Sequence, residues 1–549
     1  MKFVFDPRFL LLAVLVICPR VVQSADAPKR PVNLLFLITD QQRWDALGCA
    51  GNKVLKTPNL DRLARDGARF ASFYSSCPVC SPARTTILTG RSVGTHKVAD
   101  NRDITRDDLP ELVTFDQVLL RNGYHGEYHG KYHSPYKMAL DYNQPVRWVN
   151  GKRPAGSKAD MAEGLAFKAY IEAHVPERPL KPGELLANLY GRPYTPDPID
   201  GAYGMTQEQV EKLGRGKQVK RDLEIGQGTT YGCLDVPAEH TLTAWTAKEG
   251  IEGLERLHKT GGPFTLTISI SPPHPPMAVA KPYYGMYPAD TIPVPVSLND
   301  RGENSPYWRQ QNRDTGPYRD PQKVRQMISD YYGLVTEVDD WIGKILNRLS
   351  ELGLADNTLV IFTSDHGEML GDHGVHSKMK FFEGAAHIPL LMRLPGVIPA
   401  GKVVQAPAAQ IDLFATILDY LGMSGHESEG RSLRPLIEGK DDSADRVAVS
   451  EWHATHLPGF MVFDGRWKFM FGQTADAPSL DALYDLQNDP NEVTNLIGCN
   501  PDREKYKAEA ERMKNLLVAW LVRVKSPYLE SVKARPVIGA GETPRTQRR

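Results

Sequence analysis

The sequence has no excess of charge of either sign, few cysteines, and no hydrophobic run long enough to span a membrane. Lysine plus arginine and aspartate plus glutamate number 66 each, so the formal net charge is zero. This balance argues against nucleic acid or an anionic membrane surface as a partner of the whole chain. Six cysteines among 549 residues are too few for a disulfide scaffold. What remains is a folded globular chain, long enough for one large domain and a smaller one.

The first residues have the pattern of an export signal. Lys2 and Arg8 precede a short apolar run at residues 9–17, and small residues follow around Ser24. We therefore predict that residues 1–24 are a cleaved signal peptide. A membrane anchor would need about 20 apolar residues, so none is expected. The mature protein is predicted to be exported, and to be periplasmic or secreted.

Three short apolar runs have the composition of strands buried on both faces of a parallel sheet. They are residues 34–38, 264–268 and 358–363. Between the last two, apolar residues recur every three or four positions from Val324 to Leu349, which predicts a long crossover helix. This order predicts an α/β fold in which helices cover both faces of the sheet.

Polar side chains follow each of these predicted strands. Asp40 and Gln41 follow the first, His274 follows the second, and Asp365 and His366 follow the third. Sites in parallel sheets gather at the carboxyl ends of the strands. A lone aspartate after a strand is more often a turn residue, but two such loops in one sheet favour a metal site with oxygen and imidazole ligands.

The chain divides into two predicted domains after the signal. Residues 25–440 form the large domain, with Pro-, Gly- and Tyr-rich insertions near 140–235 and 276–320 that we expect to cover the site. Residues 441–549 form a smaller α+β subdomain with strand-like runs near 446–451 and 460–471 and a helix near 503–522.

The segment around Cys80 is the most informative part of the sequence. Ser81 can cap a helix that has Pro82 at its first position and Gly90 at its end. Cys80 would then lie just before a helix N-terminus, which favours anions. Cys77 and Cys80 also form a C-x-x-C pattern, so a redox role is one interpretation.

The other interpretation rests on the wider motif. Cys80-Ser81-Pro82-Ala83-Arg84, continuing to Leu88-Thr89-Gly90-Arg91, resembles the signature of the type I sulfatases, in the alkaline-phosphatase-like superfamily. Further elements in the same order resemble that family, namely 34–40, 57–64, 123–133, 271–276, 364–368, 378–383, 465–468 and 483–490. The resemblance covers nearly the whole mature chain, whereas redox chemistry would explain only two residues. It implies a large mixed, mostly parallel sheet with helices on both faces, plus the small C-terminal α+β subdomain.

The resemblance also implies a metal and a modified nucleophile. In this family the cysteine is oxidised to formylglycine, so Cys80 is the expected nucleophile, produced with the help of a formylglycine-generating enzyme. One Ca²⁺ per chain is expected, held by Asp40, Asp365, His366 and residue 80, with Gln41 as a further ligand.

The mechanism that the resemblance implies uses the hydrated aldehyde. One hydroxyl of the diol attacks sulfur, the alcohol leaves, and the second hydroxyl collapses to the aldehyde and expels sulfate. Arg84, Lys131, His133, His274 and Lys378 are expected to supply positive charge and hydrogen-bond donors to the sulfate oxygens. His274 or Lys378 is the expected general acid, and His133 is expected to orient the diol.

The expected activity is hydrolysis of sulfate monoesters, on a sulfated saccharide or small molecule. Gln41 and His366 depart from the commoner sulfatase pattern and resemble choline sulfatases and phosphonate monoester hydrolases, so a phosphonate monoester or phosphodiester hydrolase is the alternative enzyme. A non-catalytic glycan-binding homologue is a third possibility if Cys80 is never oxidised. Because a Cys77–Cys80 disulfide would prevent formation of the nucleophile, Cys77 is predicted to stay free. Partners for Cys49, Cys233 and Cys499 cannot be assigned.

Overall fold

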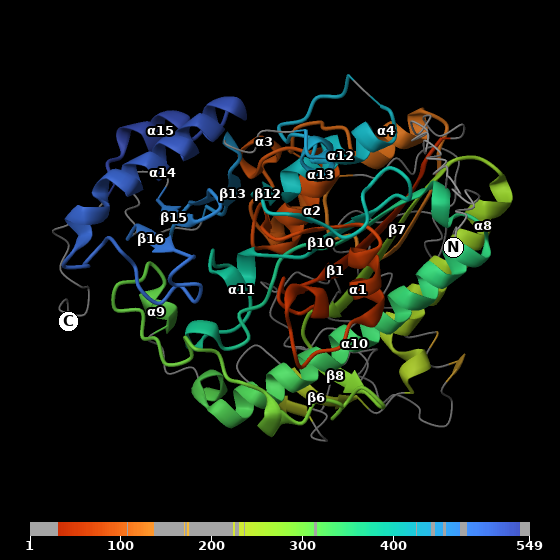
Figure 1. Ribbon diagram of the computed structural model, residues 1–549, viewed down its shortest axis with the longest axis horizontal. Helices are drawn as coiled ribbons and strands as arrows, with labels where there is room; N and C mark the ends of the chain where they lie inside the picture. The colour runs from red at the N-terminus through yellow and green to blue at the C-terminus, as the bar shows by residue number, and fades with distance from the viewer. Residues whose placement is uncertain are drawn as a thin grey trace, which may run out of the picture.

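The apolar run at residues 34–38 forms the middle of a seven-stranded sheet in the computed structural model of the chain (Figure 1). The structure describes residues 31–136 except 107, residues 170, 173, 174, 223–225, 230–234, 237–311, 316–423, 425–440, 445–453, 457–472 and 480–537. The predicted signal peptide and almost all of the predicted insertion at 140–235 lie outside these residues. Within the described part, no helix combines the length and the apolar character that crossing a membrane requires.

The central sheet is mixed and mostly parallel, as predicted. Its order is β11-β2-β10-β9-β1-β7-β4. Strands β9, β1, β7 and β4 run parallel, β10 is antiparallel to both neighbours, and β11 pairs parallel with β2. The strands are β1 Asn33–Asp40, β2 Ala68–Phe70, β4 His125–Gly130, β7 Phe264–Pro273, β9 Thr358–Ser364, β10 Leu390–Arg393 and β11 Lys402–Val404.

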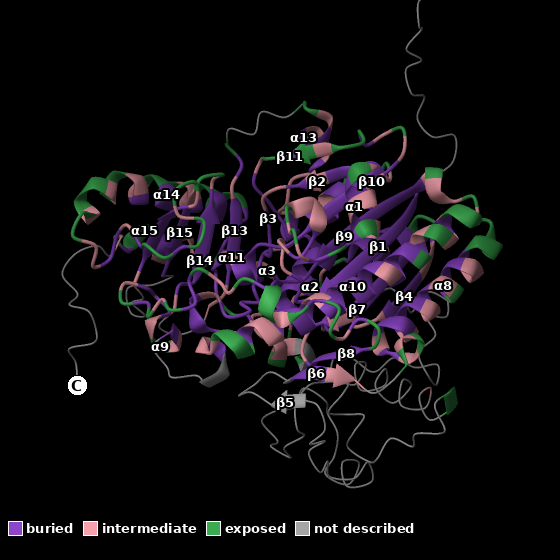
Figure 2. Ribbon diagram, turned by 60° about the horizontal axis from the view of Figure 1, so that its bottom comes forward, coloured by how far each residue is buried: buried purple, intermediate pink, exposed green. Residues whose placement is uncertain are grey.

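Helices cover both faces of this sheet because its strands are apolar on both sides. In β1, Leu35 and Leu37 pack into one core and Leu34, Phe36 and Ile38 into another. The first core includes α1 Pro58–Arg65, α8 Leu242–Thr260 and α10 Pro321–Glu351. The second includes α2 Cys80–Thr89, α4 Phe115–Arg121, α12 Leu413–Tyr420 and α13 Arg434–Glu438. Figure 2 shows the strands buried between helices whose outer surfaces are exposed.

The long crossover helix is confirmed as α10. Pro321 occupies its first turn, and the Asp320 side chain accepts hydrogen bonds from the backbone N–H groups of Gln322 and Lys323. Gly353 follows the helix end with a φ of 70°, the left-handed conformation that glycine adopts without strain.

A second, antiparallel sheet lies at the C-terminal end of the chain, at the left of Figure 1. Its strands are β13 Ala448–Glu451, β14 Phe460–Phe463, β15 Trp467–Phe471 and β16 Ala482–Asp485, and it packs with α14 Arg503–Arg523 and α15 Leu529–Ala534. The same core takes in Tyr74, Phe381 and Phe382 from the large part of the chain. The predicted C-terminal α+β unit is therefore present. Its predicted boundary at 440 adjoins residues 441–444, which lie outside the described residues.

The remaining elements are short. They are β3 Phe73–Tyr74, β12 Ala408–Ala409, β5 Leu223–Ile225, β6 Thr230–Leu234, β8 Met277–Ala280, α3 Val93–His96, α9 Trp308–Gln311 and α11 Glu383–Ala386, with single 3-10 turns at Gly48–Ala50, Asn101–Thr105, Ala238–His240, Ala289–Thr291, Gly316–Arg319, Ala355–Asn357, Asp372–Gly374 and Gln410–Asp412. The predicted insertion at 276–320 thus holds β8, α9 and turns. Strand β8 pairs with β6 in a small three-stranded sheet.

Candidate active site

Two aspartates end neighbouring strands at the same edge of the central sheet. Thr39 of β1 pairs with Ser364 of β9, so Asp40 and Asp365 leave the sheet side by side. Both are fully buried. The backbone carbonyl of Asp365 accepts hydrogen bonds from Ser75 Oγ at 2.6 Å and Gln410 Nε2 at 2.7 Å. The second strand end is therefore fixed by two other segments of the large domain.

Cys80 begins helix α2, which approaches the same edge. The helix starts one residue before Ser81, with Val79 as the N-cap, so the predicted Ser81 cap is wrong. The side chain of Asn101, which lies in a separate turn, satisfies this end of the helix. Its Oδ1 accepts a hydrogen bond from the backbone N–H of Ser81 at 3.0 Å. Gly90 ends the helix in the left-handed conformation, as predicted. Cys80 thus lies in the first turn rather than before it, and its side chain is only 1% exposed.

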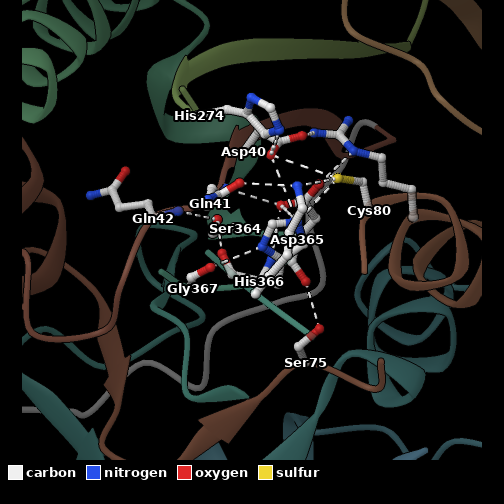
Figure 3. A network of polar contacts seen from close by, with 12 residues as sticks. Asp40, Gln41, Gln42, Ser75, Cys80, His274, Ser364, Asp365, His366 and Gly367 are labelled. Carbon is white, nitrogen blue, oxygen red and sulfur yellow. Dashed lines mark hydrogen bonds and ion pairs between the residues drawn. The ribbon is translucent and has the colours of Figure 1, made fainter. Parts of the chain in front are cut away.

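The side chains of Asp40, Cys80, Asp365 and His366 converge on one point (Figure 3). One ligand atom from each lies within 4.8 Å of all the others. Cys80 Sγ is 3.1 Å from His366 Nε2 and 3.9 Å from Asp40 Oδ1. The sequence placed these residues on three separate segments, and the fold brings them together.

The orientation of the His366 ring leaves one nitrogen available to a metal. Its Nδ1 lies 3.0 Å from the backbone carbonyl of Gly367, which can only accept, so Nδ1 carries the proton of the neutral ring. The lone pair of Nε2 then points at Cys80 and the two carboxylates, at 3.7 Å from Asp40 Oδ1 and 3.6 Å from Asp365 Oδ1. This is the tautomer that an imidazole ligand needs.

Two cations hold the carboxylates. Arg84 donates from Nε to Asp365 at 2.8 Å and from Nη2 to Asp40 at 3.2 Å, and its Nη1 reaches Ser269 Oγ and the Lys131 carbonyl. Lys131 Nζ lies 2.6 Å from Asp40 Oδ2 and 3.9 Å from Cys80 Sγ. The contacts of Arg84 therefore go to the two aspartates and to neighbouring polar groups, and its predicted contact with substrate oxygens remains a prediction.

Three further predicted residues surround Cys80. Lys378 Nζ is 2.9 Å from Cys80 Sγ. His133 contributes to lowering the pKa of the Cys80 thiol, and Cys80 acts to raise the pKa of His274, so both rings interact with the sulfur. The His274 side chain is 29% exposed, in contrast to the buried aspartates, and its Nε2 is 4.0 Å from Asp40 Oδ1.

The charges around Cys80 shift its acidity and that of its neighbours. Burial raises the pKa of the Cys80 thiol, but Lys131 and Lys378 outweigh burial and bring that pKa well below its ordinary value. Asp40 likewise has a lowered pKa, since Lys131 and His274 offset its burial. Burial and the charge of Lys378 lower the pKa of His274 to about 4. The position of Cys80 Sγ is thus a place where the chain stabilises negative charge.

The donor set fits a divalent cation. Two buried carboxylates and one imidazole lone pair face a common point, and hard cations such as Ca²⁺ prefer carboxylate oxygens. The carboxylates lie close enough that burial and Asp40 together raise the pKa of Asp365, a repulsion that a bound cation would relieve. Gln41 follows Asp40, and its side-chain oxygen accepts a hydrogen bond from Lys378 Nζ at 3.0 Å. Its predicted role as a metal ligand remains a prediction.

Asn101 and Glu368 belong to the site but were missed as individual residues. Asn101 Nδ2 lies 4.0 Å from Cys80 Sγ while its Oδ1 binds the start of α2. Glu368 is fully buried and accepts a hydrogen bond from Gln41. An acidic residue two positions after His366 was a usable signal for Glu368, whereas no local pattern marks Asn101.

Cys77 is a free, fully buried thiol, as predicted, and packs in a small apolar cluster with Val79 and Val93. Burial raises its pKa well above the ordinary value. Cys49 is likewise a free thiol.

Comparisons with known proteins identify the family. The profile of the family described as Sulfatase matches residues 32–423. The chain belongs to the sulfatase family. A second profile, N-sulphoglucosamine sulphohydrolase, C-terminal, matches residues 371–520. The protein is accordingly an enzyme of the sulfuric ester hydrolase class, and the predicted family and fold are confirmed.

Relatives with curated names span nearly the whole of this sulfatase. It is 27% identical over 518 residues to the arylsulfatase of Clostridium perfringens, covering 91% of this chain and 96% of that protein. It is 27% identical to the multifunctional alkaline phosphatase superfamily protein PehA of Trinickia caryophylli (85% and 91% covered). It is 25% identical to the N-acetylglucosamine-6-O-sulfatase of Bacteroides thetaiotaomicron (93% and 90% covered). Among solved structures, the phosphonate monoester hydrolase of Agrobacterium radiobacter matches with a TM-score of 0.68 and 25% identity, over 90% of this chain and 96% of that one.

Proposed function

We propose that this sulfatase is an exported enzyme that hydrolyses sulfate monoesters of a saccharide, using a formylglycine made from Cys80 and one bound Ca²⁺. The observation that carries the proposal is the buried group of Asp40, Cys80, Asp365 and His366, with Lys131 and Lys378 beside the sulfur. A residue that reacts at this point is surrounded by positive charge, which is what attack on a sulfate ester requires.

The roles of the residues follow from their contacts. Asp40, Asp365 and His366 would hold the cation, which when bound acts as a Lewis acid beside residue 80. A hydrated formylglycine at position 80 would supply a hydroxyl nucleophile. Arg84 keeps both aspartates in place. Lys131, His133, His274 and Lys378 offer donors to the sulfate oxygens.

His274 is the better placed of the two expected general acids. It is 29% exposed, so it lies at the entrance from solvent, where the departing alcohol would be. Lys378 is 7% exposed and close to residue 80, which suits a donor to the sulfate group. We therefore assign the proton for the leaving oxygen to His274 and charge stabilisation to Lys378. Because burial and Lys378 lower the pKa of His274 to about 4, this role requires the anionic sulfate ester to raise that pKa when it binds.

The proposed saccharide substrate and the proposed export are supported by different observations. The relative from Bacteroides thetaiotaomicron is named for a sulfated sugar, N-acetylglucosamine 6-O-sulfate, and matches along nearly the whole chain. Export rests on the signal pattern of residues 1–24. Maturation by a formylglycine-generating enzyme would have to precede folding, because Cys80 and Arg84 are 1% and 3% exposed.

A second candidate activity is hydrolysis of phosphonate monoesters or phosphodiesters with the same nucleophile. It is favoured by Gln41 and His366 at the ends of the two strands and by the match to the phosphonate monoester hydrolase. Both kinds of ester are monoanions, but a sulfate monoester has three terminal oxygens, whereas the phosphorus esters have two and a second substituent. One site can therefore discriminate between them by shape.

The experiment combines mass spectrometry with a substrate comparison. Protein produced together with a formylglycine-generating enzyme is digested, and the peptide spanning Phe70 to Arg84 is expected to carry an aldehyde or its hydrate at position 80. The kcat/KM for an aryl sulfate is then expected to exceed that for an aryl phosphonate and for an aryl phosphodiester. The Cys80→Ala variant is the control and should lose all three activities. An unmodified thiol with full activity would overturn the mechanism, and a preference for the phosphonate would transfer the assignment to the second candidate.

A further inference from the structure

A buried chain of three polar side chains connects the ends of both metal-site strands to residue 80. Gln41 follows β1, Glu368 lies in the loop after β9, and Lys378 ends that loop. They are 1%, 0% and 7% exposed, respectively. Gln41 Nε2 donates to Glu368 Oε2, Lys378 Nζ donates to Gln41 Oε1 at 3.0 Å, and the same Nζ lies 2.9 Å from Cys80 Sγ.

The direction of each bond in this chain is determined by Glu368. A carboxylate only accepts hydrogen bonds and an ammonium only donates, so the amide between them has one workable orientation. Turned by 180°, the Gln41 NH₂ would face the Lys378 ammonium and its oxygen would face the carboxylate, and both contacts would be repulsive. Glu368 therefore decides that Lys378 meets an oxygen.

Glu368 is itself held by its own loop. Its Oε1 accepts hydrogen bonds from the backbone N–H of Leu370, at 3.2 Å, and from that of Ser377. The Ser377 bond ends directly beside Lys378, so the carboxylate determines both the backbone position of the lysine and the partner of its ammonium. The Gln41 backbone is also fixed, with a φ of 67° and its carbonyl accepting from Tyr331 Oη at 2.8 Å.

We propose that Glu368 is a positioning residue of this site, which orients the amide of Gln41 so that its oxygen holds the Lys378 ammonium against residue 80. The role of Lys378 in this inference rests on the proposed function, whereas the hydrogen-bond geometry does not depend on it. Glu368 does not reach residue 80 and acts only through Gln41 and Lys378.

Exchange of the two side chains tests the proposal. In Glu368→Gln, the amide oxygen keeps the two backbone N–H bonds and the new NH₂ faces Gln41, which must then turn its own NH₂ toward Lys378. We expect kcat for an aryl sulfate to fall about 100-fold, on the scale of losing one stabilising donor, with an apparent Tm close to that of the wild type. Gln41→Glu alone places two carboxylates against each other and is the matched control.

The double variant Gln41→Glu/Glu368→Gln restores the direction of every bond at the same total charge. It is expected to recover at least about tenfold over Glu368→Gln and to exceed both single variants. If Glu368 only closed its loop, Glu368→Gln would match the wild type and the double variant would be no better than Gln41→Glu. Either of these results would overturn the proposal.

A crystal structure of Glu368→Gln separates this inference from the proposed function. The inference expects Lys378 Nζ beyond hydrogen-bond distance of residue 41, whatever ester the enzyme hydrolyses. An unchanged contact between Lys378 and Gln41 would refute the inference while leaving the sulfatase mechanism intact. Conversely, wild-type protein that hydrolyses no sulfate ester would refute the proposed function, while the position of Lys378 would still decide the inference.

Discussion

Lys468 is a buried cation that joins the C-terminal sheet to the large domain, and its removal gives the sharpest stability prediction. It lies in β15 and is 0% exposed. Its three ammonium protons have three acceptors, namely Glu383 Oε1 at 2.6 Å, Glu492 Oε1 at 2.8 Å and the Phe381 carbonyl at 2.9 Å. Glu383 begins α11, five residues after Lys378, so the contact supports the segment that follows the site.

The perturbation is Lys468→Met, which keeps most of the side-chain volume and removes the charge. Glu383 and Glu492 would then lie together in a buried position without an ammonium, and the His387 ring, 2.7 Å from Glu383, would be the remaining basic partner. Breaking a buried ion pair by removing one partner costs about 3–5 kcal/mol, because the remaining charge is uncompensated. For a chain of this length this corresponds to a fall in apparent Tm of about 3–4 °C.

The loss should depend on pH in a defined direction. Burial raises the pKa of Glu492 to about 7, and Lys468 opposes that rise. A carboxyl with a raised folded-state pKa contributes stability that is present below its unfolded pKa and is lost as the pH rises through the folded one. Without Lys468 the Glu492 pKa rises further, so the difference between variant and wild type should be greater at about pH 8.5 than at about pH 6.

The assay is urea unfolding followed by tryptophan fluorescence at both pH values, with apparent Tm as a second readout. The control is Lys468→Met/Glu492→Gln, which removes one of the two opposed charges and should cost less than Lys468→Met alone at the higher pH. A loss that is equal at both pH values, or a double variant that is less stable than Lys468→Met, would show that packing rather than charge explains the effect.

Two further predictions concern the site. His274→Ala should lower kcat more for sulfate esters with poor leaving groups than for activated aryl sulfates, because only a poor leaving group needs the proton. For the poor leaving groups we expect a loss of about 100-fold or more. An equal loss of kcat across a series of aryl sulfates would show that His274 is not the general acid. Ca²⁺ should raise the apparent Tm of the wild type in a concentration-dependent manner, because it binds only the folded state. Asp365→Asn should abolish that shift in a thermal-unfolding titration, and an unchanged shift in the variant would place the cation elsewhere.

Much of the scaffold of this sulfatase could be predicted from local patterns. The run at residues 34–38 is apolar at every position, so it had to lie in a strand covered on both sides, and β1 does. The periodicity from Val324 to Leu349 likewise defined α10. The predicted start of α2 was wrong by two residues: the helix begins at Cys80, and the N–H of Ser81 donates to Asn101, about 20 positions away in the chain.

The sequence by itself determined which residues are the main candidates for the chemistry, because strand ends and the motif around Cys80 are local features. Only the tertiary structure decided what each of them contacts. Gln41 and Glu368 are separated by 327 residues, yet their contact sets the partner of Lys378. The folded chain directs Arg84 to Asp40 and Asp365, which no local pattern showed, and its expected contact with the sulfate oxygens remains a prediction. Hydrogen-bond partners of this kind depend on distances and directions between segments that meet only after folding, and residue type and spacing do not encode them.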